Sequence, residues 1–371
     1  MNQLDIFDFL DGGENYKPIK STDWEWTMAN DYPEKNGLKV FSCFACGGGS
    51  TMGYKLAGCD VIGCCEIDPK MNEVYITNHH PKHNFLMDIR EFNKTPNEEL
   101  PTELFDLDIL DGSPPCTTFS MAGEREESWG KKKKFREGQA EQTLDDLSFV
   151  FIETVAKLRP KIVIMENVEG LIKGAAWSYV QRIYKQLRDI GYQVKHWLLE
   201  GEKMGVPQTR HRVFFVAARD DISFNFESLD MSFNYEAVPY GVIKSLVAKE
   251  VKKHTKIRNC LENATYDECD LGFAAERLYG KRMFFTYKIA DAKRVLSTIA
   301  AHHGGVTILD REELSYISDN TIINASTFPQ DYDFGSQSAT YICGMSVPPI
   351  MIKRIVTRLI ESGLFDYKLQ K

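Results

Sequence analysis

From residue 38 to residue 219 the chain alternates short apolar runs with longer stretches of helical periodicity. Apolar runs of about four to eight residues suit buried strands, and apolar residues about three or four positions apart suit helices. Because parallel strands need crossover connections, this alternation predicts an α/β fold with a mostly parallel sheet covered on both faces. The expected strands are residues 38–44, 59–66, 83–86, 107–112, 161–167, 195–200 and 212–219, with helices at 147–159 and 177–191.

The same pattern divides the chain into segments. Residues 1–37 are polar and acidic and form an N-terminal extension. After residue 219 the alternation gives way to mixed polar, aromatic and basic sequence, which predicts a second, smaller domain over residues 220–310. Helical periodicity returns in residues 311–371, where Pro348 and Pro349 precede an apolar pattern that ends before Gly363. We therefore expect the α/β domain of 38–219 to be completed by 311–371.

Charge limits how the protein could contact nucleic acid. The formal net charge of −8 argues against binding over the whole surface. Two segments are locally basic. The first is Lys131–Lys134 with Arg136, and the second is residues 241–294, which contain twelve Lys or Arg and seven Asp or Glu and so have a net charge of +5. A basic face is compatible with DNA, but an ordinary solvated surface has the same composition, so charge alone does not decide.

The cysteines and the apolar runs indicate the compartment. Nine cysteines, an odd number, fit reduced thiols better than a disulfide framework. Cys43 and Cys46 have CxxC spacing, but no second pair follows, so we expect packed thiols and no metal site. No apolar run reaches the ~18 residues of a membrane-spanning helix, and the N-terminus lacks the order of a signal peptide. We expect a cytoplasmic protein.

Residues that follow three of the expected strands suit a ligand containing adenosine. The first strand runs into a glycine-rich turn, where Gly48 and Gly49 allow a ligand to approach the backbone closely. Glu66, after the second strand, is placed to accept hydrogen bonds from ribose hydroxyls. Asp88 and Ile89, after the third, offer a carboxylate for an adenine amino group beside an apolar contact. A tight strand–helix turn explains the glycines alone, but not the three strand ends together.

One cysteine stands at the end of the fourth expected strand, in the segment GSPPCTTFS (112–120). Two prolines stiffen the turn before Cys116 and set its direction. A lone cysteine is usually an inert buried side chain. A rigid Pro-Pro turn at a strand end, beside the expected cofactor site, favours a reactive thiol instead.

Two further strand ends supply a carboxyl and a guanidinium. Glu166 would lie beside the Cys116 turn if their strands are neighbours, and a carboxyl enclosed there can donate a proton; a helix-capping carboxylate is the alternative. Gln208, Arg210 and Arg212 alternate, so in an extended segment they share one face. Thiol, carboxyl and guanidinium suit a pyrimidine: the thiolate adds to C6, the carboxyl contacts N3 and the arginine holds O2, which makes C5 nucleophilic. A cytosine in a duplex must be flipped out first.

These blocks, in this order, resemble the DNA cytosine C5-methyltransferase family. FACGGG (44–49) is similar to its S-adenosylmethionine loop, GSPPCTTFS to its Pro-Cys motif and ENV (166–168) to its glutamate motif. QTRHR (208–212) is similar to its QxRxR motif, and GMSVPP (344–349) to its closing block. The match covers most of 38–219 and 311–360, and the combination of Pro-Cys, ENV and QxRxR at this spacing is highly specific.

The resemblance implies a Rossmann-like class I methyltransferase sheet of seven strands with a smaller target-recognition domain. It implies that Cys116 is the nucleophile, that Glu166 is the N3 partner and that Arg212 contacts O2. Arg210 would organise the site, and the segment after Ser120 corresponds to a mobile loop that closes over DNA. The residues implied to contact S-adenosylmethionine are Phe44, Gly48, Gly49, Glu66, Asp88, Ile89, Leu147 and Ser346.

The resemblance also implies partners. It indicates a prokaryotic or phage-type enzyme of restriction–modification that works on double-stranded DNA as a monomer, with a companion restriction endonuclease as a further candidate. Four positions depart from the family pattern. Ser42 stands where Asp is usual, Cys46 where the first glycine is usual, Met345 where Asn is usual and Thr117 where Gln is common. None of them is one of the three catalytic residues.

Three alternatives compete with this interpretation. One branch of the family methylates tRNA cytosine, but the Cys-Phe-Thr block typical of that branch is missing from the recognition region. A catalytically silent DNA-binding homologue would have no use for the intact catalytic residues. A Rossmann oxidoreductase would explain the glycines and Glu66, but not the Pro-Cys and ENV motifs.

Overall fold

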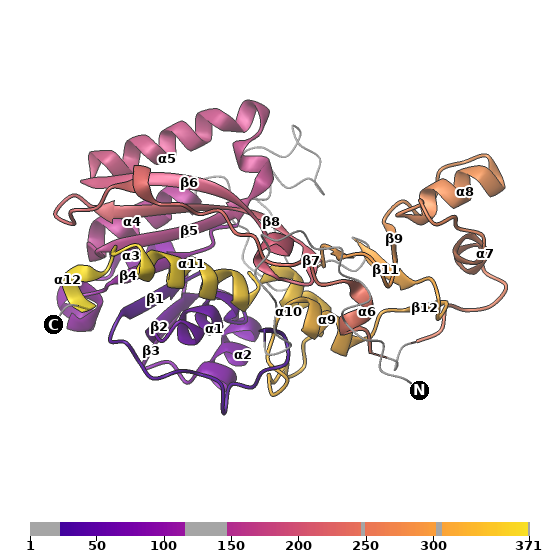
Figure 1. Ribbon diagram of the computed structural model, residues 1–371. Coiled ribbons are helices and arrows are strands. Elements are labelled where there is room, and N and C mark those ends of the chain that lie inside the picture. The colour runs from indigo at the N-terminus through magenta and orange to yellow at the C-terminus, as the bar shows by residue number, and fades with distance from the viewer. Residues whose placement is uncertain (1–22, 116–146, 246–248, 302–305, 370–371) are drawn as a thin grey trace. The chain divides into compact units, whose positions relative to one another are not determined.

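A computed structural model describes residues 23–115, 147–245, 249–301 and 306–369 (Figure 1). Its centre is a seven-stranded sheet, and all seven predicted strands are present in it. Their order across the sheet is β3-β2-β1-β4-β5-β8-β6, and every pairing from β3 to β5 is parallel, whereas β8 runs antiparallel to β5. The mostly parallel α/β sheet is therefore confirmed. The strands are β1 (Lys39–Cys43), β2 (Asp60–Glu66), β3 (His83–Leu86), β4 (Ile109–Gly112), β5 (Ile162–Val168), β6 (Tyr192–Glu200) and β8 (His211–Arg219).

Helices cover both faces of this sheet (Figure 1). The two helices predicted at 147–159 and 177–191 are confirmed as α4 and α5, and Gly191 has the left-handed φ of 82° that ends α5. The α-helices around the sheet are α1 (Gly49–Leu56), α2 (Pro69–His79), α3 (Ile89–Lys94), α4 (Leu147–Leu158), α5 (Trp177–Asp189), α11 (Pro349–Glu361) and α12 (Asp366–Leu369). Short 3-10 helices are η3 (Asn97–Glu99), η4 (Thr102–Phe105), η5 (Glu169–Ile172), η6 (Gly174–Ala176) and η8 (Phe226–Ser228).

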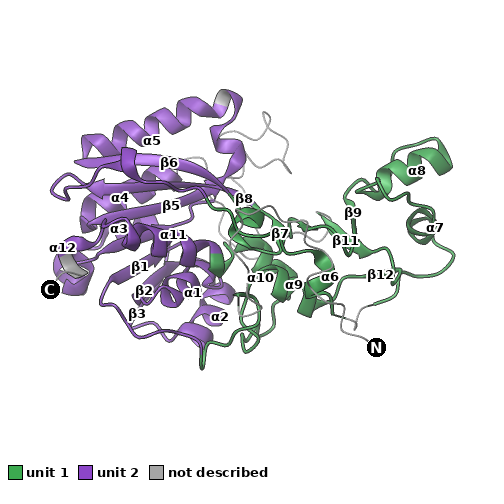
Figure 2. Ribbon diagram, viewed as in Figure 1, with its two compact units in different colours: residues 1–30, 200–210, 233–350 green, residues 31–199, 211–232, 351–371 purple. Residues whose placement is uncertain are grey.

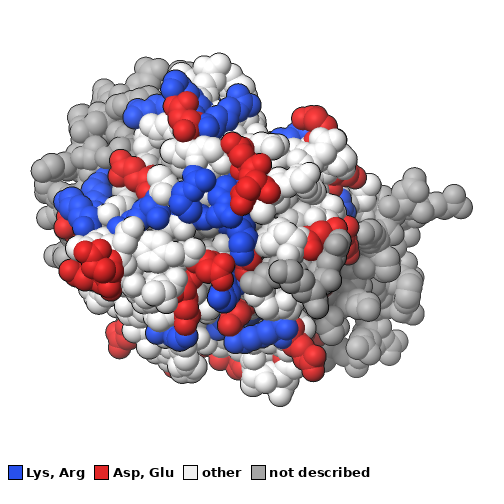
Figure 3. Space-filling view, turned by 90° about the vertical axis from the view of Figure 1, so that its left-hand side faces the viewer, with Lys and Arg blue, Asp and Glu red and all other residues white. Residues whose placement is uncertain are grey.

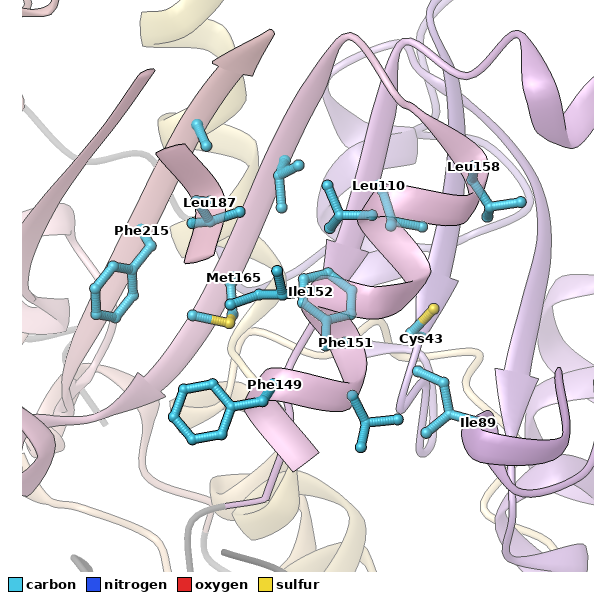
Figure 4. Packing of buried hydrophobic residues seen from close by; sticks show 14 of the residues in the cluster. Cys43, Ile89, Leu110, Phe149, Phe151, Ile152, Leu158, Met165, Leu187 and Phe215 are labelled. Atoms are coloured by element: carbon cyan, nitrogen blue, oxygen red, sulfur yellow. The ribbon is translucent and has the colours of Figure 1, made fainter. Parts of the chain in front are cut away.

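The main hydrophobic core lies between the sheet and helices α3, α4 and α5 (Figure 4). Helix α4 contributes Phe149, Phe151 and Ile152, which pack over strand residues such as Leu110 and Met165. Burying one such side chain is worth about 1.5–3 kcal/mol, so this layer carries much of the folding free energy. Strand ends on this core are held in place by packing, which a site at the sheet edge requires.

The described residues separate into two compact units (Figure 2). Unit 2, residues 31–199, 211–232 and 351–371, contains the large sheet; unit 1 comprises residues 1–30, 200–210 and 233–350. Unit 1 has a three-stranded sheet in the order β12-β11-β9, and a small core in which α7 and α8 pack with β9 and β11. Its elements are η7 (Gly201–Met204), β7 (Gln208–Thr209), α6 (Tyr240–Ile243), α7 (Lys256–Glu262), α8 (Leu271–Tyr279), β9 (Tyr287–Ala290), β10 (Leu296–Ser297), β11 (Thr307–Asp310), β12 (Ser315–Tyr316), α9 (Asp319–Ala325) and α10 (Ala339–Met345).

Within unit 1, part of the N-terminal extension is tied to a segment far along the chain. The indole N–H of Trp26 donates to the carbonyl of Thr327 at 2.9 Å, and the Gln330 N–H donates to the Trp26 carbonyl at 2.8 Å. Trp26 is buried. Trp26, in the later part of the predicted extension, is therefore packed within unit 1, whereas residues 31–37 belong to unit 2. Across the described ranges, no helix is long and apolar enough to cross a membrane.

Candidate active site

The glycine-rich turn between β1 and α1 has an unusual backbone. Phe44, Cys46 and Gly48 all have positive φ, at 57°, 48° and 82°. The Phe44 N–H donates to the Cys65 carbonyl at 2.9 Å, which joins the turn to β2. The Phe44 ring packs against the main core, with its centroid 6.4 Å from that of Phe151. Phe44 and Cys46 are not glycines, so each left-handed backbone conformation costs about 1–3 kcal/mol of conformational free energy. Backbone strain of this kind is concentrated at functional sites.

Glu66, the predicted ribose partner, holds this turn in place. Its Oε2 accepts the N–H of Cys46 at 2.8 Å, and its Oε1 accepts the N–H groups of Ile67 and Asp68 at 2.9 and 2.8 Å. Burial raises the pKa of the Glu66 carboxyl, and the three backbone hydrogen bonds oppose that rise. A carboxylate has room for about four hydrogen bonds, so one acceptor position is left for a ligand.

The other predicted cofactor residues of unit 2 gather at the same core. Ile89 and Leu147 are buried in the cluster against which Phe44 packs. Asp88 caps α3: its Oδ1 accepts the Arg90 N–H at 2.8 Å, and the Arg90 Nη1 lies 3.3 Å from its Oδ2. Phe44, Ile89 and Leu147 thus belong to one apolar cluster, the first following β1 and the other two beginning α3 and α4.

His79, which the sequence analysis did not single out, lies directly beneath the glycine turn. Its Nε2 is 3.2 Å from the Gly47 carbonyl, and a Cβ added to Gly48 would be 2.0 Å from the same atom. Burial is the main cause that lowers the pKa of His79 to about 3, so the ring is neutral at neutral pH. The imidazole, as well as the φ of 82°, therefore requires glycine at position 48. No local sequence signal could have found a contact 31 residues away.

The predicted carboxyl and guanidinium form an ion pair. Strands β5 and β8 are antiparallel neighbours in which Val168 faces Arg212 and Glu166 faces Phe214. This diagonal register brings the Arg212 Nε to 2.9 Å from the Glu166 Oε1, with 17% and 12% of the two side chains exposed. A charge pair so largely removed from water is costly to break, because each partner would be left without its counter-charge.

Asn167, between Glu166 and Val168, connects this pair to the Pro-Pro segment. Its side-chain amide donates to the Pro114 carbonyl at 3.3 Å, and its Oδ1 accepts the Val168 N–H at 2.9 Å. Asn167 is buried. Cys116 lies outside the described residues, as do Thr117, Lys131–Lys134 and Arg136. The described chain therefore brings the residue two positions before Cys116 to the residue after Glu166.

Arg210 and Ser346 lie in unit 1. The buried Arg210 donates from Nη1 to the Ile299 carbonyl at 3.2 Å and from Nη2 to the Gly344 carbonyl at 3.0 Å, so it organises the GMSVPP block. Ser346 follows α10 and is buried. The expected continuous extended segment is interrupted: β7 ends at Thr209 and β8 begins at His211. The side chain of Arg210 bonds to residues of unit 1, and that of Arg212 bonds to a residue of unit 2. The alternation of Gln208, Arg210 and Arg212 in the sequence therefore did not predict these partners.

Comparison with known proteins identifies the family. The family model described as C-5 cytosine-specific DNA methylase matches residues 38–361. The chain belongs to this family. It is 33% identical to the Type II methyltransferase M.HindV of Haemophilus influenzae over 333 residues, which is 87% of this chain and 97% of that protein. It is 32% identical to the Type II methyltransferase M.FnuDI of Fusobacterium nucleatum over 191 residues, which is 51% of this chain and about half the length, 50%, of that relative.

Two solved structures share the fold. A prophage-encoded protein of E. coli, assigned as a DNA modification methyltransferase, superposes with a TM-score of 0.63 at 16% identity, over 89% of this chain and 100% of that one. A mutant of Spodoptera frugiperda DNMT2 has a TM-score of 0.59 at 15% identity, over 87% and 100%. At such identities these likenesses establish the fold alone.

Proposed function

We propose that this chain is a DNA cytosine-5 methyltransferase that uses S-adenosylmethionine. The observation that carries the proposal is the Glu166–Arg212 pair, joined through Asn167 to the segment that leads to Cys116. The thiolate of Cys116 attacks C6 of a flipped cytosine while Glu166 holds a proton at N3 and Arg212 binds O2. C5 gains nucleophilic character and would attack the methyl group, whose bond to the donor's sulfonium would break to leave a neutral thioether. Loss of the C5 proton and expulsion of the thiolate restore the aromatic ring.

The residues around the glycine turn fit the proposed methyl donor. Phe44, Ile89 and Leu147 offer apolar contacts for an adenine ring, and Glu66 keeps an acceptor position for a ribose hydroxyl. Asp88, partly satisfied by Arg90, adds a carboxylate at the end of β3. When bound, S-adenosylmethionine would supply an electrophilic methyl group. The task of these residues is to bind and orient it.

The decisive experiment measures transfer of tritiated methyl from S-adenosylmethionine to unmethylated DNA, with tRNA as the control and base-resolution mapping of the product. Label at C5 of cytosine within one short DNA motif supports the proposal. Label in tRNA alone moves the chain to the RNA branch of the family. Cys116→Ala should abolish transfer and leave DNA binding intact; equal turnover in that variant excludes the mechanism.

We also propose that residues 220–310, of which 233–310 belong to unit 1, form the target-recognition domain and bind double-stranded DNA. Helix α7 and its flanks border an open polar cavity of about 560 Å³ lined by Lys253, Lys256 and Tyr279, among others. Lys253 and Lys256 are exposed, and the Lys256 ammonium lies 5.3 Å from the centre of the Tyr279 ring. Arg258, in contrast, is paired with Glu250 and Glu262 at 2.9 and 2.6 Å. Exposed cations beside an aromatic ring suit phosphate and sugar.

This DNA-binding role has a salt-dependent signature. Replacing Lys253 and Lys256 by alanine should weaken DNA binding equally for all sequences and reduce the salt slope by about one per lost phosphate contact. An unchanged slope contradicts the assignment. The face of the molecule shown in Figure 3 is the reference surface for this salt dependence. Its Lys and Arg residues are interspersed with Asp and Glu.

The Type II names of M.HindV and M.FnuDI support a restriction–modification role. We propose that the enzyme is a monomer and has a companion restriction endonuclease of the same sequence specificity. Light scattering should give a mass near 42.4 kDa for the free protein, and the mass of the DNA complex should correspond to one chain per bound duplex. DNA methylated in full by this enzyme should resist the companion nuclease, and cleavage of that DNA contradicts the pairing.

A further inference from the structure

Asp111 is a buried carboxyl that the proposed mechanism does not use. It lies on β4, directly across from Ser42 of β1 in the register of the two parallel strands. Its Oδ2 accepts the Ser42 hydroxyl at 2.7 Å, and its Oδ1 accepts the Tyr54 hydroxyl of α1 at 3.0 Å. One side chain thus joins two strands and a helix.

The elements that Asp111 joins lead to both halves of the site. Strand β1 continues into the turn at Phe44, and α1 begins directly behind that turn at Gly49. Strand β4 continues through Gly112 toward Pro114, whose carbonyl is bonded to Asn167. The carboxyl is therefore a shared anchor for the glycine turn and for the segment that precedes Cys116.

The protonation state of Asp111 changes what this anchor can do. Burial raises the pKa of its carboxyl to about 7, the Ser42 and Tyr54 hydroxyls lower it, and the charge of Glu166 on β5 raises it. The other titratable groups that interact with it electrostatically are Cys43 of β1 and Tyr75 of α2. As an anion the carboxyl accepts both hydroxyls; once protonated it carries a donor hydrogen of its own, and one of these bonds must rearrange.

We propose that Asp111 is a positioning residue for methyl transfer: as a carboxylate it holds β1, α1 and β4 so that the glycine turn and the Cys116 segment keep their working geometry. The inference rests on the proposed function. It also accounts for a departure from the family pattern, because the serine at position 42 is the partner of this carboxyl across the two strands.

The test is the pH dependence of single-turnover methyl transfer from about pH 5.5 to 9, a range that brackets the ionisations of Asp111 and of a free thiol. In the wild type, loss of the Asp111 proton should produce a rise in rate near pH 7, separate from the later rise that thiol ionisation causes. Asp111→Asn should abolish the first rise, keep the second and lower the rate at pH 8 about ten- to 100-fold, as expected for a misplaced site. Ser42→Ala and Tyr54→Phe should move the first rise to higher pH, because each removes a donor that lowers the pKa.

Asp108→Asn is the matched control. Asp108 is a second buried carboxyl, at the opposite end of the same strand, where it accepts the Lys39 N–H at 2.9 Å and pairs with Lys161 at 3.0 Å. This variant should lose stability but keep the wild-type pH profile. If the pH profile of methyl transfer is unchanged in Asp111→Asn, the inference is overturned. If that variant does not fold, the inference is overturned when the pH profiles of Ser42→Ala and Tyr54→Phe match that of the wild type. Absence of methyl transfer to DNA by the wild type refutes the proposed function instead.

Discussion

Two carboxylates, Glu66 at the end of β2 and Glu166 near the end of β5, are held in opposite ways at the same edge of the sheet. Glu66 is held by three backbone N–H groups, and the turn it organises needs few particular side chains. Glu166 is held by one guanidinium, that of Arg212. Backbone donors are present whatever the residue, whereas an ion pair depends on a single side chain. The comparison is consistent with the departure from the family pattern at Cys46, whose contribution to Glu66 is its backbone N–H, while Glu166 and Arg212 follow that pattern.

The largest effect should come from breaking the side-chain pair. Arg212→Ala leaves Glu166 without its counter-charge and removes the proposed O2 donor, so single-turnover methyl transfer should fall about 100- to 1,000-fold. The affinity for S-adenosylmethionine, measured by calorimetry, should stay within about threefold of wild type, a change under ~1 kcal/mol. Arg219→Ala, on the same strand and paired with Asp221, is the control. A similar loss of rate there would show that β8 is merely disturbed.

A smaller effect on rate, but a clear one on stability, is expected at Glu66. Glu66→Ala leaves three N–H groups of a largely buried turn without their acceptor, and each costs about 1–3 kcal/mol where water cannot replace it. Urea unfolding should show the loss, and cofactor affinity should fall with it. Glu73→Ala, at an exposed position of α2, should change neither. Full cofactor affinity in Glu66→Ala would contradict the role of this turn.

The contact between Gly48 and His79 tests the backbone side in another way. Gly48→Ala places a Cβ 2.0 Å from the His79 ring and strains a φ of 82°, so the free energy of unfolding should fall by about 1–3 kcal/mol. The double variant with His79→Ala should lose less than the sum of the two single losses, because the clash is gone. If chemical denaturation shows that the two losses in free energy of unfolding are strictly additive, the His79 ring is not what excludes a side chain at position 48.

The smallest effect is expected at Cys46, where the family pattern has glycine. Cys46→Gly relieves a left-handed φ of 48°, worth roughly 1–2 kcal/mol, but frees the unfolded chain by about 0.5–1 kcal/mol. The net change in stability should stay within about 1 kcal/mol, and methyl transfer should be unchanged, because the N–H to Glu66 is kept. A large loss of activity would show that the thiol itself has a role.

The alternation of apolar runs was enough to predict the seven strands and the mostly parallel sheet, because burial and periodicity are local properties of a strand or a helix. The motifs named Glu166 and Arg212 as candidate site residues, but the ion pair between them depends on the antiparallel register of β5 and β8. What local pattern could not predict was the interruption at Arg210, where the chain passes from one unit to the other.

The sequence alone determined the fold class and the family, and it predicted the residues of the candidate site. Only the tertiary structure decided which partners support it: His79 under Gly48, Asn167 on Pro114, and Asp111 between Ser42 and Tyr54. These contacts join residues that are 31 to 69 positions apart in the chain. Asp111 meets Ser42 because β4 lies beside β1, although β2 and β3 come between them in the chain, and a side chain's partner depends on the strand order and on the register.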